Sequence, residues 1–404
     1  IFMAKKETAV QAKKKNKWVK KRHARVFAFL RFAMAPFARL RYNYRAVHSD
    51  VKAPCLILAN HQTTMDPFWV SKSFRFPIYF ITSDDIFNLK ISPVIEYLVA
   101  PIPKSKSLTD LKAVKDILRV LKEGGSVGVF PEGNRTISGR QWEITDAVAK
   151  LAKAAKVPVV LYNLCGGYGT DPRWGTGIRR GNRYSGFVKR VLSPEECAAM
   201  SVEELYETIK TELYVDDVEA GGRYKSRRRA QYIERALYLC PKCGGVDTFV
   251  SRGRQFRCSK CGAEAEYTET MRISPPIAGY DRIAPWYEWE RGEIVRRVAE
   301  GERVGDSGIL FRESVKFERK KKLPGNAVAI DRENLYVEGE GEKQVYPLKD
   351  IVSLTMVGKK KFNFYYEGKI LQIKGDERFC AIKYVHIFDG LRAAGKANIE
   401  NKES

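Results

Sequence analysis

Short apolar runs alternate with amphipathic segments of helical length between residues 54 and 163. Short apolar runs bounded by turn residues predict buried strands, and apolar residues at three- and four-residue spacing predict helices. An alternation of strands and helices in turn predicts a mostly parallel sheet covered by helices. The predicted strands are 55–59, 78–82, 126–130 and 157–164, and the clearest predicted helices are 108–123 and 145–155.

Two further helices are predicted after the last strand, the first beginning at Ser193. Serine followed by proline is a typical helix start, and Ser201 begins another helix, so we expect these helices to close the first domain near residue 215.

The C-terminal part of the chain has a different pattern, of short antiparallel strands closed by one terminal helix. This pattern resembles the pleckstrin-homology superfold. Its predicted strands are 335–337, 351–357, 362–366 and 369–373, and its predicted helix is about 377–394.

The basic residues are concentrated at the start of the chain. The 404 residues carry a formal net charge of +24, and residues 1–45 contain 14 Lys and Arg and a single acid, Glu7. Such an arm suits a polyanion, either nucleic acid or an anionic membrane. Between residues 18 and 44 the cations alternate with large apolar residues, which favours amphipathic helices in a lipid interface. The alternative is a helix pair that packs on its own protein and leaves a solvated basic face.

No membrane span or signal peptide is predicted. Arg31 interrupts the apolar run, and 18 apolar residues nowhere stand together. The apolar stretch is also late and broken, and no small-residue cleavage pattern follows it. We therefore expect a peripheral, monotopic protein whose partner is an anionic membrane surface, and we do not expect a nucleic-acid partner.

Four of the eight cysteines have the spacing of metal ligands. Two CxxC pairs, each followed by glycine, are separated by 14 residues, and four thiolates suit a tetrahedral structural Zn²⁺. The alternative is a redox disulfide pair. The other cysteines follow no pattern, which favours a reducing compartment and hence the cytoplasmic face of a membrane. The predicted zinc ligands are Cys240, Cys243, Cys258 and Cys261.

The first chemical motif, NHQTTMD, runs from Asn60 to Asp66, directly after a predicted strand. Pro67 favours placing Asp66 at or beside a helix N-cap, and across such a turn it can meet His61. A carboxylate on one ring nitrogen fixes the histidine tautomer and leaves the other nitrogen free to remove a proton. The alternative is an aspartate that only caps a helix and a histidine that only satisfies core hydrogen bonds.

The second motif, FPEGNRT, runs from Phe130 to Thr136 and also follows a predicted strand. It brings Glu132, Gly133 and Arg135 to the edge of the sheet where the first motif lies, because the ends of neighbouring parallel strands form one crevice. Together the motifs predict a base and an anion-binding cation in one site.

These motifs resemble the glycerolipid acyltransferase family, which contains the 1-acylglycerol-3-phosphate acyltransferases. Asn60, His61 and Asp66 match its first signature, NH, four residues, then D, and FPEGNRT matches its glycerophosphate-binding signature. A Val-Pro pair at residues 157–158 matches its last signature. The family usually has arginine where this chain has Lys104. Lysine can neutralise a phosphate as a point charge, but it cannot form the two parallel hydrogen bonds that arginine forms.

The resemblance implies that His61 deprotonates the free hydroxyl of a lysolipid acceptor and that Asp66 orients it. The alkoxide would attack an acyl thioester carried by coenzyme A or acyl-carrier protein. The resemblance also gives roles to the second motif: Arg135 and Lys104 facing phosphate, Gly133 allowing close backbone approach, Glu132 holding Arg135 or an acceptor hydroxyl, and Thr136 completing the substrate-binding set. The expected product is phosphatidic acid from lysophosphatidic acid.

Two alternatives remain open: an acyltransferase for another lysolipid or glycerol 3-phosphate, and a non-catalytic lipid or nucleic-acid adaptor. The predicted fold class is an α/β acyltransferase domain with a mostly parallel sheet, a small zinc ribbon, and an antiparallel β domain capped by a C-terminal helix. The predicted segments are basic membrane-interface helices (1–45), the acyltransferase domain (46–215), a basic linker (216–238), the zinc ribbon (239–268), an aromatic and proline-rich connector (269–304) and the pleckstrin-homology-like domain (305–396).

Overall fold

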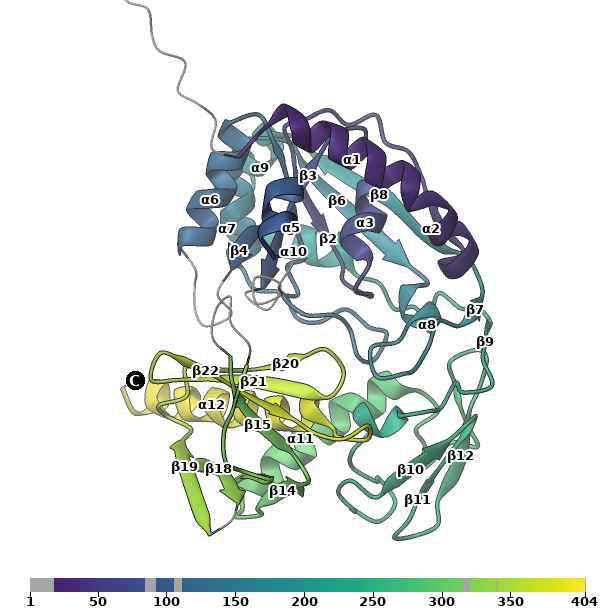
Figure 1. The fold of residues 1–404 in the computed structure, drawn as a ribbon, viewed down its shortest axis with the longest axis vertical. Helices are drawn as coiled ribbons and strands as arrows, with labels where there is room; N and C mark the ends of the chain where they lie inside the picture. The colour runs from purple at the N-terminus through teal and green to yellow at the C-terminus, as the bar shows by residue number, and fades with distance from the viewer. Residues whose placement is uncertain (1–17, 84–91, 105–110, 315–319, 340, 404) are drawn as a thin grey trace, which may run out of the picture.

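The computed structural model describes residues 18–83, 92–104, 111–314, 320–339 and 341–403. The chain forms two lobes (Figure 1). The upper lobe contains one large sheet with helices on its two faces, and the lower lobe contains the two C-terminal sheets and a smaller sheet beside them. The first 17 residues of the predicted basic arm lie outside the described residues.

The upper lobe is built on a seven-stranded sheet of order β1-β8-β6-β2-β5-β3-β4. The strands from β6 to β4 in this order are parallel, whereas β8 is antiparallel to β6. This arrangement confirms the predicted mostly parallel sheet. The strands are β1 (Tyr44–Ala46), β2 (Leu56–Ala59), β3 (Ile78–Ser83), β4 (Ile102–Lys104), β5 (Ser126–Val129), β6 (Val159–Cys165) and β8 (Tyr184–Leu192).

The central strands are buried on both faces, and β2 is apolar at every position. In β2, Leu56 and Leu58 pack on one face of the sheet, and Ile57 and Ala59 pack on the other. The first face is covered by α6 (Leu111–Lys122), α7 (Ala147–Ala155), α9 (Pro194–Ala199) and α10 (Val202–Leu213), and the second by α1 (Lys21–Ala33), α2 (Ala35–Tyr42) and α3 (Asp66–Ser71).

Helices α9 and α10 begin where the sequence predicts. Ser193 accepts a hydrogen bond from the Glu196 N–H, and the Glu196 side chain accepts from the Ser193 N–H. Ser201 and Glu204 form the same reciprocal pair at the start of α10. Such capping boxes satisfy amide groups that the first helical turn leaves unpaired.

Helices α1 and α2 pack one side on the domain and leave the other side exposed. Phe27 and Tyr42 pack on the domain, whereas Phe32 and Leu40 are 81% and 85% exposed. The exposed side includes further apolar residues from α5 (Ser92–Val99), which neighbours α1. Within the described residues, no helix is both long and apolar enough to cross a bilayer.

The predicted linker, residues 216–238, differs from expectation. Its second half is buried, because η1 (Ile233–Arg235) places Ile233 and Leu237 in the core of the lower lobe. Two of its cations are buried as well: Arg229 pairs with Glu266, and Arg235 with Glu377. The second half of the segment therefore belongs to the lower lobe, whereas Asp217 in its first half bonds to Gln62 of the upper lobe. The two lobes also meet where β9 (Tyr224–Lys225) pairs with β7 (Arg180–Gly181).

The cysteine-containing segment forms a small antiparallel sheet. It consists of β10 (Phe249–Arg252), β11 (Gln255–Cys258), β12 (Glu264–Tyr267) and β13 (Ile273–Ser274). The aromatic connector packs against this sheet. Trp286, on α11 (Ile283–Ala299), is fully buried and donates its indole N–H to the Leu239 carbonyl. Trp286 and Tyr287 thus lie in the core of the lower lobe.

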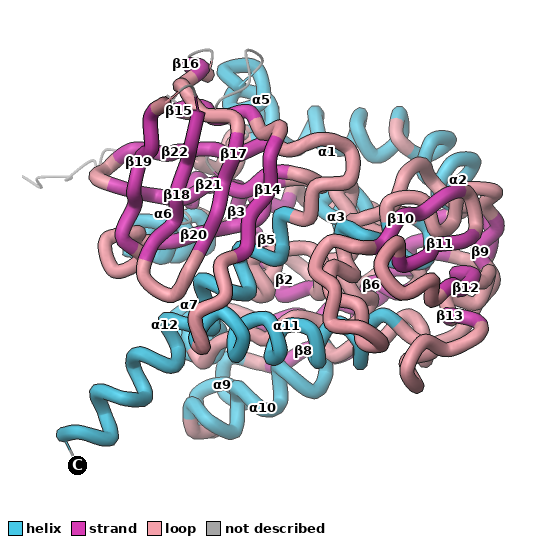
Figure 2. Tube along the Cα trace, turned by 90° about the horizontal axis from the view of Figure 1, so that it is seen from below, coloured by secondary structure: helices cyan, strands magenta, loops and turns pink. Residues whose placement is uncertain are grey.

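The C-terminal module contains two antiparallel sheets and a helix, seen from below in Figure 2. Its elements match the predicted pattern, and the likeness to the pleckstrin-homology superfold stays a prediction. The first sheet has β14 (Val304–Ser307), β17 (Ala327–Ile330), β18 (Asn334–Gly339) and β19 (Glu342–Pro347). The second has β15 (Leu310–Glu313), β16 (Lys321–Lys322), β20 (Ser353–Val357), β21 (Lys361–Tyr366) and β22 (Lys369–Lys374), and the helix is α12 (Ala381–Glu403).

Candidate active site

The structure brings His61 and Asp66 together at the end of β2. His61 Nδ1 lies 2.8 Å from Asp66 Oδ2, and Asp66 begins α3 with Pro67 behind it. The carboxylate is fully buried, whereas the histidine side chain is 19% exposed. Because Asp66 accepts the Nδ1 proton, the lone pair of His61 lies on Nε2, the nitrogen left free for a substrate.

Four further hydrogen bonds hold the Asp66 carboxylate. The Gln62 and Thr63 N–H groups donate to Oδ2 at 2.6 and 2.9 Å, the Thr63 hydroxyl donates to Oδ1, and the Tyr184 hydroxyl donates to Oδ1 at 2.6 Å. A buried carboxylate is stable when its lone pairs are satisfied in this way. These hydrogen bonds hold the Asp66 side chain in the position that orients His61.

Arg135 and Gly133 lie in the loop after β5, the strand next to β2. The Arg135 guanidinium donates to the Thr64 hydroxyl at 2.8 Å, so the second motif reaches across to the first. Gly133 has a φ of 65°, and the space where a Cβ would stand is open. Both observations suit a loop that admits a ligand to its backbone, as the sequence predicts.

Glu132 does not hold Arg135. One of its carboxylate oxygens accepts the His61 N–H at 2.7 Å, and the other accepts the Trp142 N–H at 2.9 Å. Burial raises the pKa of Glu132 to about 8, an effect that these two N–H donors oppose. The structure thus gives Glu132 the role of fixing the backbone of His61, and the predicted pairing with Arg135 is wrong. The alternative role, contact with an acceptor hydroxyl, stays a prediction.

Thr136 likewise supports the backbone around His61 in this structure. Its N–H donates to the His61 carbonyl at 2.9 Å, and its hydroxyl donates to the Arg140 carbonyl at 2.6 Å. The side chain is 2% exposed. Direct contact of Thr136 with a substrate was predicted, but burial and these hydrogen bonds make it a link between the two motifs.

Lys104 is the last residue of β4 and is exposed. The strand order places β4 two strands from β5, or about 10 Å at ordinary strand spacing. A lysine side chain directed along that edge of the sheet is compatible with a ligand shared with Arg135, and this role stays a prediction.

His61 is kept neutral by its surroundings. Its ring stacks on Phe130 at 4.2 Å between centroids. Burial lowers its pKa most, Asp66 raises it, and the positive charges of Arg135 and Arg173 lower it further, so that the pKa lies below its ordinary value of 6.5. A neutral imidazole at pH 7 is the form that acts as a general base.

Sequence reasoning missed three supporting residues: Tyr184, Asp217 and Arg173. Tyr184 comes from β8, the antiparallel strand, and Asp217 accepts hydrogen bonds from Gln62 Nε2 and the N–H groups of residues 166 and 168. Arg173 is buried and bonds to the second motif. These residues stand far from both motifs along the chain, and no local pattern marks them.

The four predicted metal ligands also meet in the structure. The sulfur atoms of Cys240, Cys243, Cys258 and Cys261 all lie within 4.8 Å of one another. Four cysteine thiolates at such separations are the donor set of a structural zinc site. The cluster lies in the lower lobe, outside the His61 site.

Comparison with known proteins agrees with this geometry. Residues 41–161 match the family model described as Acyltransferase, and they include both motifs. The chain contains an acyltransferase domain. This domain carries His61 and Arg135 at the edge of its central sheet.

Similar proteins include a 1-acyl-sn-glycerol-3-phosphate acyltransferase of Pseudomonas aeruginosa, 27% identical over 39% of this chain and 60% of that protein. A chloroplastic protein of the same name from Brassica napus is 29% identical over 31% of this chain and 37% of its own length. The solved structure of the Thermotoga maritima 1-acyl-sn-glycerophosphate (LPA) acyltransferase, PlsC, is 19% identical, with a TM-score of 0.38 over 47% of this chain and 76% of that one. The chain thus spans less than two thirds of these two sequence relatives.

Proposed function

We propose that this protein transfers an acyl group from a thioester to the free hydroxyl of lysophosphatidic acid, giving phosphatidic acid. The main support is the His61–Asp66 pair, which leaves His61 Nε2 free at the same sheet edge as Arg135. The names of the sequence relatives support the acceptor. Coenzyme A and acyl-carrier protein are both suitable carriers of the acyl group.

The reaction follows from the site. His61 Nε2 takes the proton of the acceptor hydroxyl as its oxygen attacks the thioester carbonyl. The tetrahedral intermediate collapses with cleavage of the C–S bond, and the imidazolium returns the proton to the departing thiolate. Asp66 stabilises the imidazolium between these steps. Arg135 binds the acceptor phosphate, and its positive charge adds to the effect of burial in lowering the pKa of His61.

The site requires an anchor, because lysolipids and long acyl chains reside in a membrane. Helices α1 and α2 present Phe29, Phe32 and Leu40 to solvent, among the cations Arg25 and Arg39. An amphipathic surface of this kind binds the interface of an anionic bilayer. We therefore place the protein peripherally on the cytoplasmic face of a membrane, with a zinc ion bound by the four cysteines as a structural element.

The test is incubation of the purified full chain with a panel of lysolipids and glycerol 3-phosphate, each with acyl-coenzyme A or acyl-carrier protein, and identification of products by mass spectrometry. Formation of phosphatidic acid from lysophosphatidic acid is expected. Preferred acylation of another acceptor would move the proposal to that acceptor. Binding of lysolipid without thioester consumption would favour a non-catalytic adaptor.

A further inference from the structure

Seven exposed cations form a band along one side of the molecule, which we call the basic band. None of them forms an ion pair within the described residues, whereas Arg223 beside them pairs with Glu269 at 3.0 Å. Like charges at this density repel one another, so a surface that keeps them close is suited to an anionic partner. The basic band consists of Arg180, Arg183, Lys225, Arg227, Arg228, Arg252 and Arg254.

The basic band is continuous because backbone contacts join its segments. Arg180 and Lys225 lie opposite each other in the antiparallel strand pair β7 and β9. The Ala230 N–H donates to the Gly253 carbonyl at 3.0 Å, beside Arg252. The band therefore spans from the junction of the two lobes to the turn between β10 and β11. Its residues come from three separate stretches of the chain, so no single charge run in the sequence reveals it.

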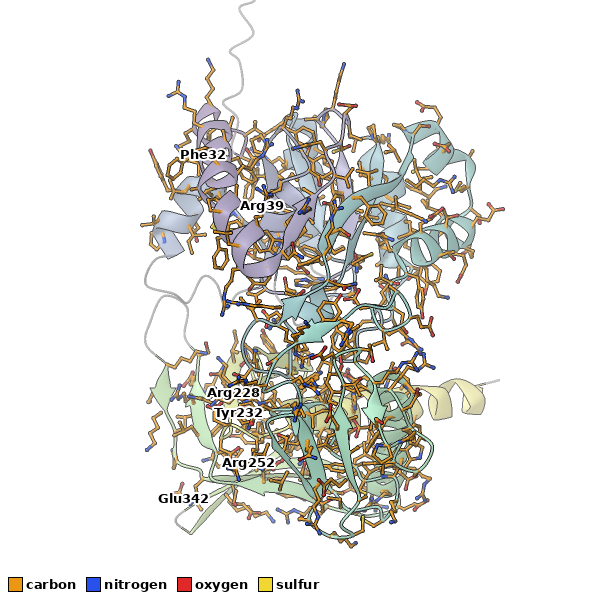
Figure 3. All side chains as sticks on the ribbon, turned by 90° about the vertical axis from the view of Figure 1, so that its right-hand side faces the viewer. Phe32, Arg39, Arg228, Tyr232, Arg252 and Glu342 are labelled. Atoms are coloured by element: carbon orange, nitrogen blue, oxygen red, sulfur yellow. The ribbon has the colours of Figure 1, made fainter. Side chains whose placement is uncertain are left out.

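The upper end of the basic band meets the N-terminal helices. Asn43, which ends α2, donates its side-chain N–H to the Gly181 carbonyl at 3.1 Å. Arg39 and Arg41 are exposed on α2 beside Leu40. Figure 3, which views the right-hand side of Figure 1, labels Arg39 on the upper lobe and Arg228 and Arg252 on the lower lobe.

Apolar side chains distinguish a lipid surface from nucleic acid. Along β10, Val250 and Arg252 share the outward face of the small sheet, and Val250 is 46% exposed. At the other end, Phe37 and Leu40 are 42% and 85% exposed. Val250 and Leu40 are exposed aliphatic residues among these cations, and such residues suit a headgroup interface, whereas the bases of single-stranded nucleic acid stack on aromatic rings.

We propose that the basic band is a second membrane-docking surface, which binds anionic headgroups and holds both lobes against the bilayer. It adds to the anchor of α1 and α2 and extends membrane contact to the turn between β10 and β11 in the lower lobe. With the basic band, the bilayer contacts both lobes along one side of the molecule and not only α1 and α2. This contact fixes the orientation of the active site relative to the lipid.

The test uses the full chain with four substitutions, Arg180→Gln, Arg183→Gln, Arg227→Gln and Arg228→Gln. A matched control neutralises four exposed lysines outside the band: Lys115→Gln, Lys122→Gln, Lys156→Gln and Lys369→Gln. Binding is measured by sedimentation with phosphatidylcholine vesicles with and without phosphatidylglycerol, and to duplex DNA at the same ionic strength. Unfolding temperature checks that both variants fold.

The band variant should lose at least about tenfold in affinity for the anionic vesicles, with the control close to wild type, because each basic residue near an anionic surface adds to the electrostatic attraction. Equal loss in both variants overturns the proposal, since it would reflect net charge alone. Unchanged vesicle binding with lost DNA binding also overturns it, in favour of nucleic acid. Acyl transfer to detergent-solubilised acceptor tests the proposed function separately, because it needs no vesicle.

Discussion

Asp66 accepts hydrogen bonds on both carboxylate oxygens, and this arrangement determines how His61 behaves. The carboxylate fixes the tautomer, while burial and nearby cations keep the ring neutral. The balance matters because a base with a pKa far above the working pH is already protonated, and one with a very low pKa removes protons poorly. Burial and the nearby cations lower the pKa of His61, whereas the Asp66 carboxylate raises it.

The pH dependence of acyl transfer follows from this balance. The base is active only when neutral, so kcat/KM should rise with pH through the His61 pKa and level off, with the acidic limb below pH 6.5. Arg135→Gln removes one repulsive charge, so its limb should move to higher pH, and kcat/KM should fall about 10- to 100-fold with the lost charged contact. A limb at the same pH in both proteins would show that Arg135 does not act on His61.

Glu132 gives a second prediction at the residue scale. Its pKa of about 8 lies above the ordinary value of 4.5, so the folded protein holds this proton more tightly than the unfolded chain. The contribution of Glu132 to stability is therefore complete below pH 4.5 and is lost as the pH rises toward 8.

Denaturant unfolding of the wild type and of Glu132→Gln from pH 5 to pH 8 measures this effect. The wild type should lose stability relative to the variant as the pH rises, by at most about 1.4 kcal/mol per pH unit. Parallel stability curves would mean that Glu132 is ionised throughout and that the backbone N–H donors outweigh its burial.

At the scale of elements, Arg173 fastens the second motif to the C-terminal module. Its guanidinium donates to the Asn134 side chain and the Arg135 carbonyl on one side, and to the carbonyls of Met356 and Gly358 on the other. It is 1% exposed, and all four acceptors are uncharged. The turn between β20 and β21 is thereby held against the loop that carries Arg135.

Arg173→Gln should raise the KM for the acceptor about tenfold with a smaller change in kcat, because the loop carrying Arg135 loses its support. It should also move the acidic limb of the pH profile upward, since Arg173 lowers the pKa of His61. Steady-state kinetics at several pH values provide both readouts.

Arg235→Gln is the matched control, because Arg235 joins Trp174 to Glu377 across the same interface without touching the second motif. If the control raises KM as much as Arg173→Gln, the effect belongs to the interface as a whole. Asn134→Ala, which removes one acceptor and leaves Arg173 in place, supplies a milder variant should Arg173→Gln fail to fold.

The sequence predicts elements better than it predicts their contacts. The predicted strand at 126–130 and the structure's β5 agree to within a residue, because short apolar runs between turns have few alternatives. The His61–Asp66 pair was also predictable, since a proline beside a cap restricts the turn. Glu132 was misassigned because its partners are backbone N–H groups, one of which belongs to a residue 71 positions away. The second half of the linker was misread because two of its cations, Arg229 and Arg235, are buried beside carboxylates that only the tertiary fold brings near.

At the scale of the whole molecule, buried ion pairs and hydrogen bonds connect the cysteine cluster to the rest of the lower lobe. Lys383 of α12 is fully buried between Asp247, which follows the first CxxC pair, and Asp306 of β14. Glu290 of α11 accepts the N–H groups of Tyr238 and Leu239, directly before Cys240. The cluster is thus joined to both helices and to the first C-terminal sheet.

One zinc ion per chain is therefore expected by elemental analysis. Its removal by a strong chelator, or Cys258→Ser, should lower the unfolding temperature, because structural zinc sites contribute folding free energy directly. Cys55→Ser, which alters a buried cysteine outside the cluster, is the control. A metal-free protein with unchanged unfolding would rule out a structural zinc.

The most direct test of the central claim is acyl transfer by wild-type protein, His61→Ala and His48→Ala, each supplied with lysophosphatidic acid and an acyl thioester in detergent. His48 is exposed and lies outside the site, so its variant controls for the loss of an imidazole. We predict equal release of thiol and phosphatidic acid from the wild type and His48→Ala, and a rate lower by a factor on the order of 10² to 10⁴ in His61→Ala. Undiminished transfer by a folded His61→Ala protein would contradict the account.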